Sequence, residues 1–147
     1  MNARGWTWRL GMAGVVALTL TACEGTTDLT GPTQGLSLDP ESLIGLWELT
    51  ELESSDEGAV RVEPGTFTAE FAGSEVYLKA DCNRCRAGYT AGEGSLDVGL
   101  LACTLAYCPS APLDTTFTQL MSAAKGWEVD GGRLVVTSGE GVLIFVR

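Results

Sequence analysis

The stretch TFTAEFAGSEVYLKADC, residues 66–82, alternates apolar and polar side chains in two runs that are separated by a turn. In the first run Phe67, Ala69 and Phe71 share one face, because successive side chains of a strand point to opposite sides of a sheet. Residues 72–74, Ala-Gly-Ser, turn the chain. The sequence therefore predicts an antiparallel β-hairpin here. The apolar face of the second run is Val76, Leu78, Ala80 and Cys82.

Segments with the same two-residue period lie on both sides of this hairpin. Turns rich in Gly separate several of them, at residues 90–95 and 130–132, where glycine accepts a positive φ. The pattern predicts a meander of about seven or eight antiparallel strands. The further expected strands are residues 46–52, one that ends at Tyr89, and residues 96–100, 127–129, 134–136 and 142–146.

Residues 113–124 break this pattern with an apolar stripe at helical spacing. Ser110 and Pro112 suit the first turn of a helix, Asp114 is favourable near its positive end, and Gly126 fits just past its last turn. The stripe indicates a buried face rather than a cofactor-binding face. The fold class expected is therefore α+β, with one helix. The stripe consists of Leu113, Phe117, Leu120, Met121 and Ala124.

The first residues have the features of a bacterial export signal. Two arginines precede an apolar stretch that runs to Leu20, and the ending LTAC, residues 20–23, resembles a lipobox. We expect residues 1–22 to be a lipoprotein signal peptide and Cys23 to carry the lipid. Plain secretion and a retained membrane anchor are the alternatives, although the stretch is shorter than the about 20 apolar residues that span a bilayer.

Residues 23–41 hold the expected lipidated cysteine and a tether rich in Gly, Thr and Pro. A flexible segment of this length spans about 20–25 Å on average, which lets the following domain stand off a membrane. Residues 42–147 suffice for one small domain with a modest core.

The expected mature chain is strongly acidic. The full sequence has 9 basic and 19 acidic residues, and loss of the leader with its two arginines changes the net charge from −10 to −12. No nucleic-acid partner is expected, because phosphate requires a basic surface. The chain has no histidine, which excludes Ser-His-Asp and Cys-His catalysis and histidine metal sites. We expect no enzyme activity, no cofactor and no metal.

Four cysteines follow Cys23 with the spacing C-x2-C-x17-C-x4-C. In an oxidising compartment they favour two disulfides. Nested pairing, Cys85 with Cys103 and Cys82 with Cys108, keeps the sum of paired residue numbers almost constant at 188 and 190. The crossed alternative gives 185 and 193, which an antiparallel hairpin accommodates less well. In a regular strand Cys82 and Cys85 would face opposite sides, so a bulge or two different faces is expected.

Two other interpretations of the cysteines remain open. Four thiolates at this spacing resemble a structural zinc site, which needs reduced cysteines. The segment Cys82-Asn83-Arg84-Cys85 could alternatively form a redox pair, with Arg84 and Arg86 stabilising a thiolate.

Several short motifs are distributed along residues 42–147. They are LWEL at 46–49, DCNR at 81–84, Gly88-Tyr89, Leu96, TLAYC at 104–108 and Leu134 with a closing apolar strand. In this order they resemble the META domain family, which includes heat-shock-associated lipoproteins of bacterial envelopes.

The resemblance implies a curved antiparallel β-sheet packed on a single α-helix. It favours the pair Cys82–Cys108, with Cys85–Cys103 as an added second pair. Asp81 stands where the family commonly has glycine, and Asp adopts positive φ less readily than Gly. The family implies a fold and a compartment rather than an activity.

These observations predict a non-catalytic envelope lipoprotein that acts as an interaction or stress-related module. Its expected partners are the membrane, through the lipid on Cys23, and an unidentified envelope protein. Glu24 after the lipidated cysteine favours the outer membrane, with the domain facing the periplasm. One alternative is an inhibitor of a basic enzyme such as lysozyme, through the five carboxylates of residues 51–63. Another is a thiol–disulfide oxidoreductase that uses Cys82 and Cys85.

Overall fold

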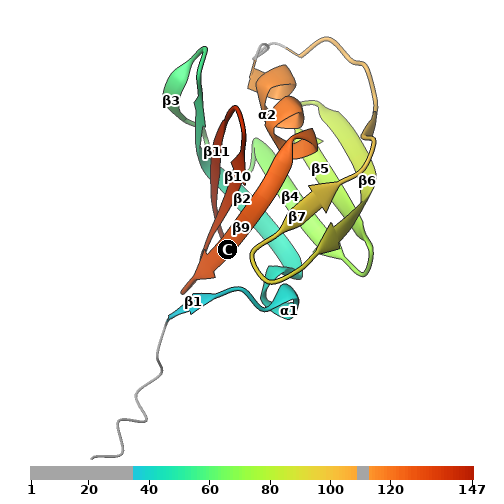
Figure 1. Cartoon of the computed structure of the whole chain (residues 1–147). Coiled ribbons are helices and arrows are strands. Elements are labelled where there is room, and N and C mark those ends of the chain that lie inside the picture. Colours follow the sequence, from blue (N-terminus) through green and yellow to red (C-terminus); the bar gives the residue numbers. More distant parts are fainter. Residues whose placement is uncertain (1–34, 109–112) are drawn as a thin grey trace, which may run out of the picture. The chain divides into compact units, whose positions relative to one another are not determined.

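The computed structural model describes residues 35–108 and 113–147. The expected signal peptide, Cys23 and most of the tether lie outside the described residues, as do Ser110 and Pro112. Within the described ranges, every helix is too short or too polar to cross a bilayer. Residues 32–147 make up one folded unit, whose described part is shown in Figure 1.

Strands make up most of this unit. The seven longer ones are β2 (Gly45–Ser54), β4 (Phe67–Ala72), β5 (Glu75–Ala80), β6 (Asn83–Ala91), β9 (Ala124–Asp130), β10 (Arg133–Ser138) and β11 (Gly141–Val146). The four shorter ones are β1 (Leu36–Ser37), β3 (Gly58–Arg61), β7 (Leu96–Val98) and β8 (Ala102–Cys103). They pair in the order β1-β9-β10-β11-β2-β4-β5-β6-β7, with β3 added to β2 and β8 added to β6.

The sheet curls until its two ends meet. Ser95, just before β7, forms a bridge with Gly126 of β9. The backbone N–H of Trp127 donates to the carbonyl of Gly94 at 3.1 Å. The buried indole of Trp127 donates to the carbonyls of Gly92 and Ser95, at 3.1 and 3.0 Å. These bonds close the sheet into a barrel, visible in Figure 1 where β7 approaches β9.

A helix covers each end of the barrel (Figure 1). The longer one, α2 (Leu113–Ser122), buries Phe117, Leu120 and Met121. The ring of Phe117 meets two strand phenylalanines edge-on, Phe67 at 5.3 Å and Phe145 at 6.3 Å between centroids. The fold is mostly antiparallel β-sheet with a small helical part packed against it, which confirms the predicted architecture in part.

The second helix, α1 (Pro40–Leu43), is a single turn. Asp39 caps it by accepting the N–H of Glu41 at 3.0 Å, and Pro40 stands at the first helical position, where its missing donor costs nothing. Leu43 is fully buried, and its carbonyl accepts the indole N–H of Trp47 at 2.8 Å.

Two expectations from the sequence are wrong in detail. The sheet has eleven strands rather than seven or eight, and the described residues contain two helices rather than one. The additional elements β1, β3, β8 and α1 have two to four residues each, too few to show a period.

The predicted helix also runs too far. It ends at Ser122, and Ala124 and Gly126 belong to β9. Gly126 is not a helix cap: it lies in β9, where a Cβ would be 2.7 Å from the Thr137 hydroxyl and 3.3 Å from the carbonyl oxygen of Gly94.

The hairpin of residues 66–82 forms as β4 and β5, with Phe67 opposite Ala80 and Gly73 turning the chain at φ +60°. However, the strand stops at Ala80, and Cys82 belongs to the turn before β6. Asp81 takes the left-handed conformation, at φ +56°. The residue in the usual glycine position therefore adopts the backbone that glycine would favour.

Candidate functional site

Two nested disulfides lie where β6 meets the segment that leads to α2. Cys82 is bonded to Cys108, with their Cα atoms 5.6 Å apart, and Cys85 to Cys103, with Cα atoms 4.0 Å apart. Cys85 and Cys103 are direct partners in the β6–β8 ladder, so this bridge ties two paired strands. Cys82 and Cys85 are bonded to different partners, unlike the two cysteines of a C-x-x-C redox pair.

The left-handed turn at Asp81 explains how both bridges form. Because Cys82 precedes the strand, the alternation of β6 begins at Asn83 and places Cys85 on the buried face. The Cys82 side chain is exposed, and its disulfide partner Cys108 is 1% exposed. The change of direction before the strand replaces the expected bulge.

Asn83 fastens the same segment from inside. It is the buried polar residue of the described core, and each end of its amide is used. The oxygen accepts the N–H of Ala106 at 2.8 Å and the hydroxyl of Thr104 at 3.0 Å. The nitrogen donates to the carbonyl of Ala106 at 3.1 Å and approaches the Cys108 sulfur at 3.2 Å. A satisfied buried amide of this kind fixes one conformation of the chain that it binds.

We name residues 99–108 the clamped loop. Its backbone is bound at both ends of β8: Gly99 donates to the carbonyl of Gly88, and Thr104 donates to that of Arg84, each at 2.9 Å. The motif residues Asn83, Thr104 and Cys108 therefore act together as the fastening of one loop.

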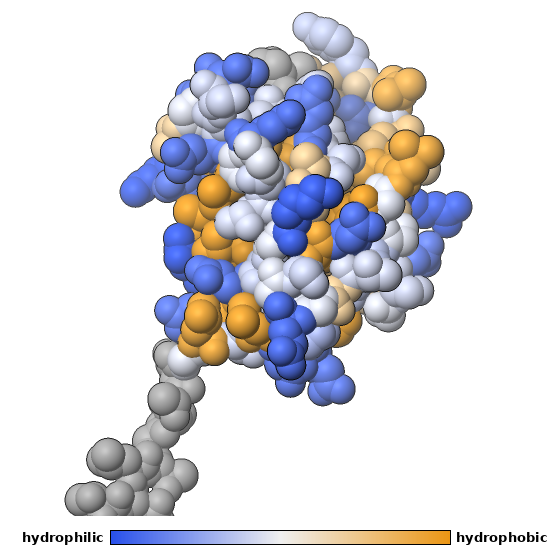
Figure 2. Space-filling model, in the orientation of Figure 1, coloured by the Kyte–Doolittle hydropathy of each residue, from blue (hydrophilic) through white to orange (hydrophobic). Residues whose placement is uncertain are grey.

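The clamped loop exposes large apolar side chains. Leu100, Leu105 and Tyr107 are 97%, 96% and 93% exposed. Figure 2 shows hydrophobic side chains gathered at the upper right, over the segment between β8 and α2. Leu100 was expected to continue the alternation of Leu96 and Val98, and this is wrong because β7 ends at Val98.

Basic side chains lie beside the clamped loop, on the outer face of β5 and β6. Tyr77 stands opposite Arg86, and Lys79 stands opposite Arg84. We name these four residues the basic strip. The Tyr77 hydroxyl donates to Glu75 at 2.7 Å, and this hydrogen bond to a carboxylate raises the pKa of Tyr77 above its usual value.

A shallow pocket of about 330 Å³ opens between the basic strip and β8. Its walls include Tyr77, Arg84, Arg86 and Thr104, and the Cys85–Cys103 bridge adds apolar surface. The site thus combines two guanidinium groups with an apolar lining.

Acidic side chains gather elsewhere, on the β2–β3 hairpin, which we name the acidic arm (residues 51–63). It projects past the barrel in Figure 1. Within the arm Arg61 and Glu51 form an ion pair at 3.8 Å, and the Arg61 side chain is 90% exposed. A pocket of about 130 Å³ separates the arm from α2.

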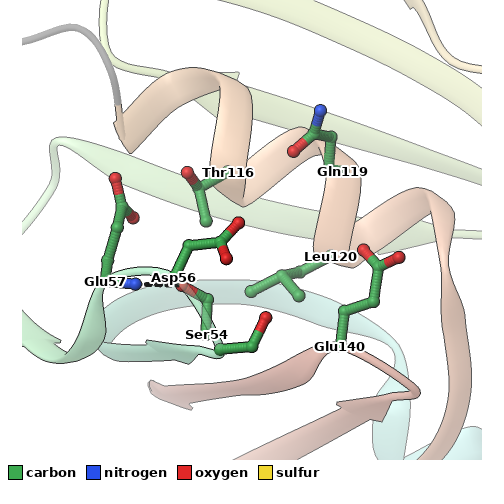
Figure 3. Close-up of a pocket in the computed structure, with 8 residues that line it drawn as sticks. Ser54, Asp56, Glu57, Thr116, Gln119, Leu120 and Glu140 are labelled. Atoms are coloured by element: carbon green, nitrogen blue, oxygen red, sulfur yellow. Dashed lines mark hydrogen bonds between the residues drawn. The ribbon is translucent and has the colours of Figure 1, made fainter.

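The carboxylates around that pocket do not converge. Figure 3 shows Asp56 and Glu57 on the arm and Glu140 on the neighbouring turn, with their carboxylates standing apart. The Ser54 hydroxyl accepts the N–H of Glu57 at 3.1 Å. Throughout residues 35–108 and 113–147, no three Cys, Asp or Glu side chains are grouped to hold a metal ion.

The comparisons with known proteins agree with this fold. Residues 41–147 match the META domain. The chain belongs to the META domain family. The match spans most of the chain and confirms the resemblance drawn from the short motifs. No curated protein matches the chain.

Three solved structures share the fold of this META domain. A protein from Burkholderia xenovorans, solved by NMR, has 20% identity and a TM-score of 0.60, and the match covers 73% of this chain and 84% of that one. A DUF4847 family protein from Bacteroides vulgatus has 10% identity and a TM-score of 0.51, over 71% and 92%. A further NMR structure has 20% identity and a TM-score of 0.55, over 73% and 92%. At these identities the likeness concerns the fold.

The sequence pointed to the four cysteines but missed the basic strip. The alternation of residues 75–80 and 83–88 placed Lys79, Arg84 and Arg86 on the polar face, which was the available signal. That they lie side by side depends on the β5–β6 register, which the turn at Asp81 sets.

Proposed function

We propose that this META domain protein is a non-catalytic binding module of the bacterial cell envelope, anchored by lipid on Cys23 and displaying the clamped loop to another envelope component. The observation that carries the proposal is the rigid presentation of three large apolar side chains. Leu100, Leu105 and Tyr107 are almost fully exposed on a segment that two disulfides and Asn83 hold in place. Apolar side chains gathered on an exposed surface mark a site of contact with a protein or a membrane.

The anchor is supported by the leader sequence. The lipobox-like LTAC places a cysteine directly after the small residues at which a leader is cut. Glu24 favours delivery to the outer membrane, with the domain in the periplasm. Such a compartment is oxidising, which suits a domain with two disulfides.

The first test is chemical and concerns the anchor. Intact mass measurement of the protein extracted from bacterial membranes should show a chain that begins at acylated Cys23. The variant Cys23→Ala should leave the membrane fraction. An unmodified Cys23, or a chain that retains residues 1–22, would contradict the anchor.

The second test concerns the clamped loop. A photoreactive amino acid in place of Leu105 should crosslink to an envelope component in living cells. The same amino acid at Ala59, an exposed position of the acidic arm, serves as the matched control. Equal crosslinking from both positions would contradict a specific role of the loop.

The acidic arm supports a second candidate function, inhibition of a basic enzyme such as lysozyme. Five carboxylates share the arm with one arginine, and the arm projects from the barrel (Figure 1). Complementary charge speeds the encounter with a cationic cleft. Lysozyme should lose activity at micromolar protein, and Asp56→Asn with Glu57→Gln should weaken the effect. Unchanged lysozyme activity would remove this candidate.

A further inference from the structure

We propose that the basic strip and the clamped loop together form a binding surface for membranes that contain anionic phospholipid. In this surface Arg84 and Arg86 hold lipid phosphate, and Leu100, Leu105 and Tyr107 enter the interface. The inference rests on the proposed function in one respect, namely that the clamped loop is a contact surface.

Basic side chains are gathered in the basic strip. Outside the leader the chain has seven basic residues, and three of them lie together in the basic strip. Arg84 and Arg86 form no ion pair with any residue of the described ranges 35–108 and 113–147. The Arg84 guanidinium donates to the carbonyl of Asn83 at 3.2 Å. Two arginines without a carboxylate partner, kept together on a domain of net charge −12, indicate an anionic ligand.

Arg84 and Arg86 are on the same face of β6, about 7 Å apart along the strand, and they border a pocket of about 330 Å³. Glu75 already accepts the Tyr77 hydroxyl, which leaves the ring of Tyr77 for contact with a ligand. A guanidinium group can bind two oxygens of one phosphate at once, so the two arginines suit a phosphate headgroup.

The pocket lies next to the clamped loop. In the β6–β8 ladder Arg86 stands opposite Ala102 and Cys85 opposite Cys103, so β8 lies directly beside the arginines. The loop residues before and after β8 carry the exposed leucines. If a phospholipid binds with its phosphate at the two arginines, its acyl chains therefore lie beside the apolar side chains of the clamped loop.

The exposure of those side chains favours a bilayer over a protein partner. Leu100, Leu105 and Tyr107 are 93–97% exposed and stand out from the domain, so they can enter a bilayer without needing a complementary pocket. A bilayer interface accommodates single projecting leucines, and tyrosine is enriched at that depth. Cations near an anionic bilayer add attraction that salt screens.

The test uses residues 24–147 without acylation, because the lipid on Cys23 would bind vesicles by itself. This segment contains the whole described core, which extends from Leu43 to Phe145. It is mixed with vesicles of phosphatidylglycerol and phosphatidylcholine in about equal parts, or of phosphatidylcholine alone, and binding is measured by co-sedimentation. Glycerol phosphate is added as a free headgroup.

Binding is expected with phosphatidylglycerol and not with phosphatidylcholine alone. The double variant Arg84→Gln/Arg86→Gln should bind the phosphatidylglycerol vesicles at least about tenfold more weakly. Leu100→Ser/Leu105→Ser should show a similar loss. The matched control Lys125→Gln/Arg133→Gln removes the same charge from exposed positions elsewhere and should stay within about twofold.

Several results would overturn the inference: no binding to either vesicle, an equal loss in the control pair, or unchanged binding in the leucine variant. Full competition by glycerol phosphate would also overturn it, because the ligand would then be a small anion rather than a bilayer. A failure here, combined with acylated Cys23 and crosslinking to a protein from position 105, would leave the proposed function standing with a protein partner.

Discussion

The acidic arm and the clamped loop both project from the barrel, but they are held in different ways. The arm is held by backbone pairing: its β2 residues pair with β11, from Glu51–Ile144 to Ser54–Gly141, and β3 pairs with β2, from Glu51–Arg61 to Ser54–Gly58. Its ion pair, between the exposed Arg61 and the partly exposed Glu51, contributes little to stability. The clamped loop has two disulfides and a buried amide.

This difference shows where the chain requires fixed geometry. Charged side chains act over several ångströms, so an acidic surface does not need a covalent brace in addition to backbone pairing. Apolar side chains act by contact, and keeping them exposed and ordered requires a covalent or buried support. The disulfides are therefore best understood as the fastening of a contact surface as well as a brace for the fold.

The largest expected effect is in the acidic arm, where β2 pairs with β11. Gly141 pairs with Ser54, and a Cβ there would lie 2.0 Å from the carbonyl oxygen of Glu53. Because that oxygen belongs to backbone in the sheet, Gly141→Ala should cost about 3 kcal/mol or more of unfolding free energy. Denaturant unfolding measures the loss.

A glycine in the same turn provides the control. Gly139 is exposed, and a Cβ there meets nothing within 4 Å, so Gly139→Ala should change stability by no more than about 1 kcal/mol. Equal losses from the two variants would show that the arm is not fixed by close backbone approach.

The next effect concerns the disulfides. Replacing Cys82 and Cys108 with alanine opens a separation of 26 residues and should cost about 3 kcal/mol by chain entropy. Replacing Cys85 and Cys103 opens 18 residues and should cost about as much. Amide hydrogen exchange should then accelerate in residues 99–108 while the arm stays unchanged. Acceleration of both regions alike would contradict a local fastening.

Variants of Asn83 distinguish the contribution of its amide to stability from that of the disulfides. Asn83→Ala should cost about 2 kcal/mol, because it removes the hydrogen bonds that this buried amide forms with the N–H and the carbonyl of Ala106. Asn83→Asp should cost at least as much, since the carboxylate donates nothing and lies near Asp114. Thermal unfolding with both disulfides intact is the measurement, and wild-type stability in both variants would refute the role of the amide.

The sequence predicted the long strands well because each carries several alternations; the hairpin of residues 66–80 is an example. It missed β8, which has two residues, because pairing there depends on Cys85 meeting Cys103 across the sheet. It also missed the barrel closure, since the hydrogen bonds of Trp127 reach carbonyls more than thirty residues away. Contacts of that range leave no local period.

The fastening of the candidate site was partly visible in the sequence and its surface was not. Cysteine spacing and the register sum pointed to nested bridges, whereas the role of Asn83 depends on a loop that begins sixteen residues later, at Gly99. The exposure of Leu100 contradicted the pattern of residues 96–100, because leucine was assumed to follow the buried face.

The smallest expected effect appears at alkaline pH, on the side of the clamped loop. Tyr89 of β6 packs edge-on against Phe71 at 5.0 Å, and burial raises the pKa of Tyr89 above its usual value of 10.0. The folded state therefore favours the neutral phenol. This stability is fully present below pH 10 and is lost as the pH rises through the folded value.

Tyr89→Phe should reduce this alkaline loss, and the acidic arm, which has no tyrosine, should not contribute to it. Denaturant unfolding near neutral pH and above pH 10 compares the two proteins. An identical loss of stability at alkaline pH in wild type and variant would show that a group other than Tyr89 causes it.

The most direct test of the account is disulfide mapping of the protein taken from its native membrane, digested without reduction and with free thiols trapped. The account predicts the linked pairs Cys82–Cys108 and Cys85–Cys103, with no trapped thiol at these four positions. Free thiols at these cysteines, or bridges between Cys82 and Cys85, would contradict a covalently clamped loop.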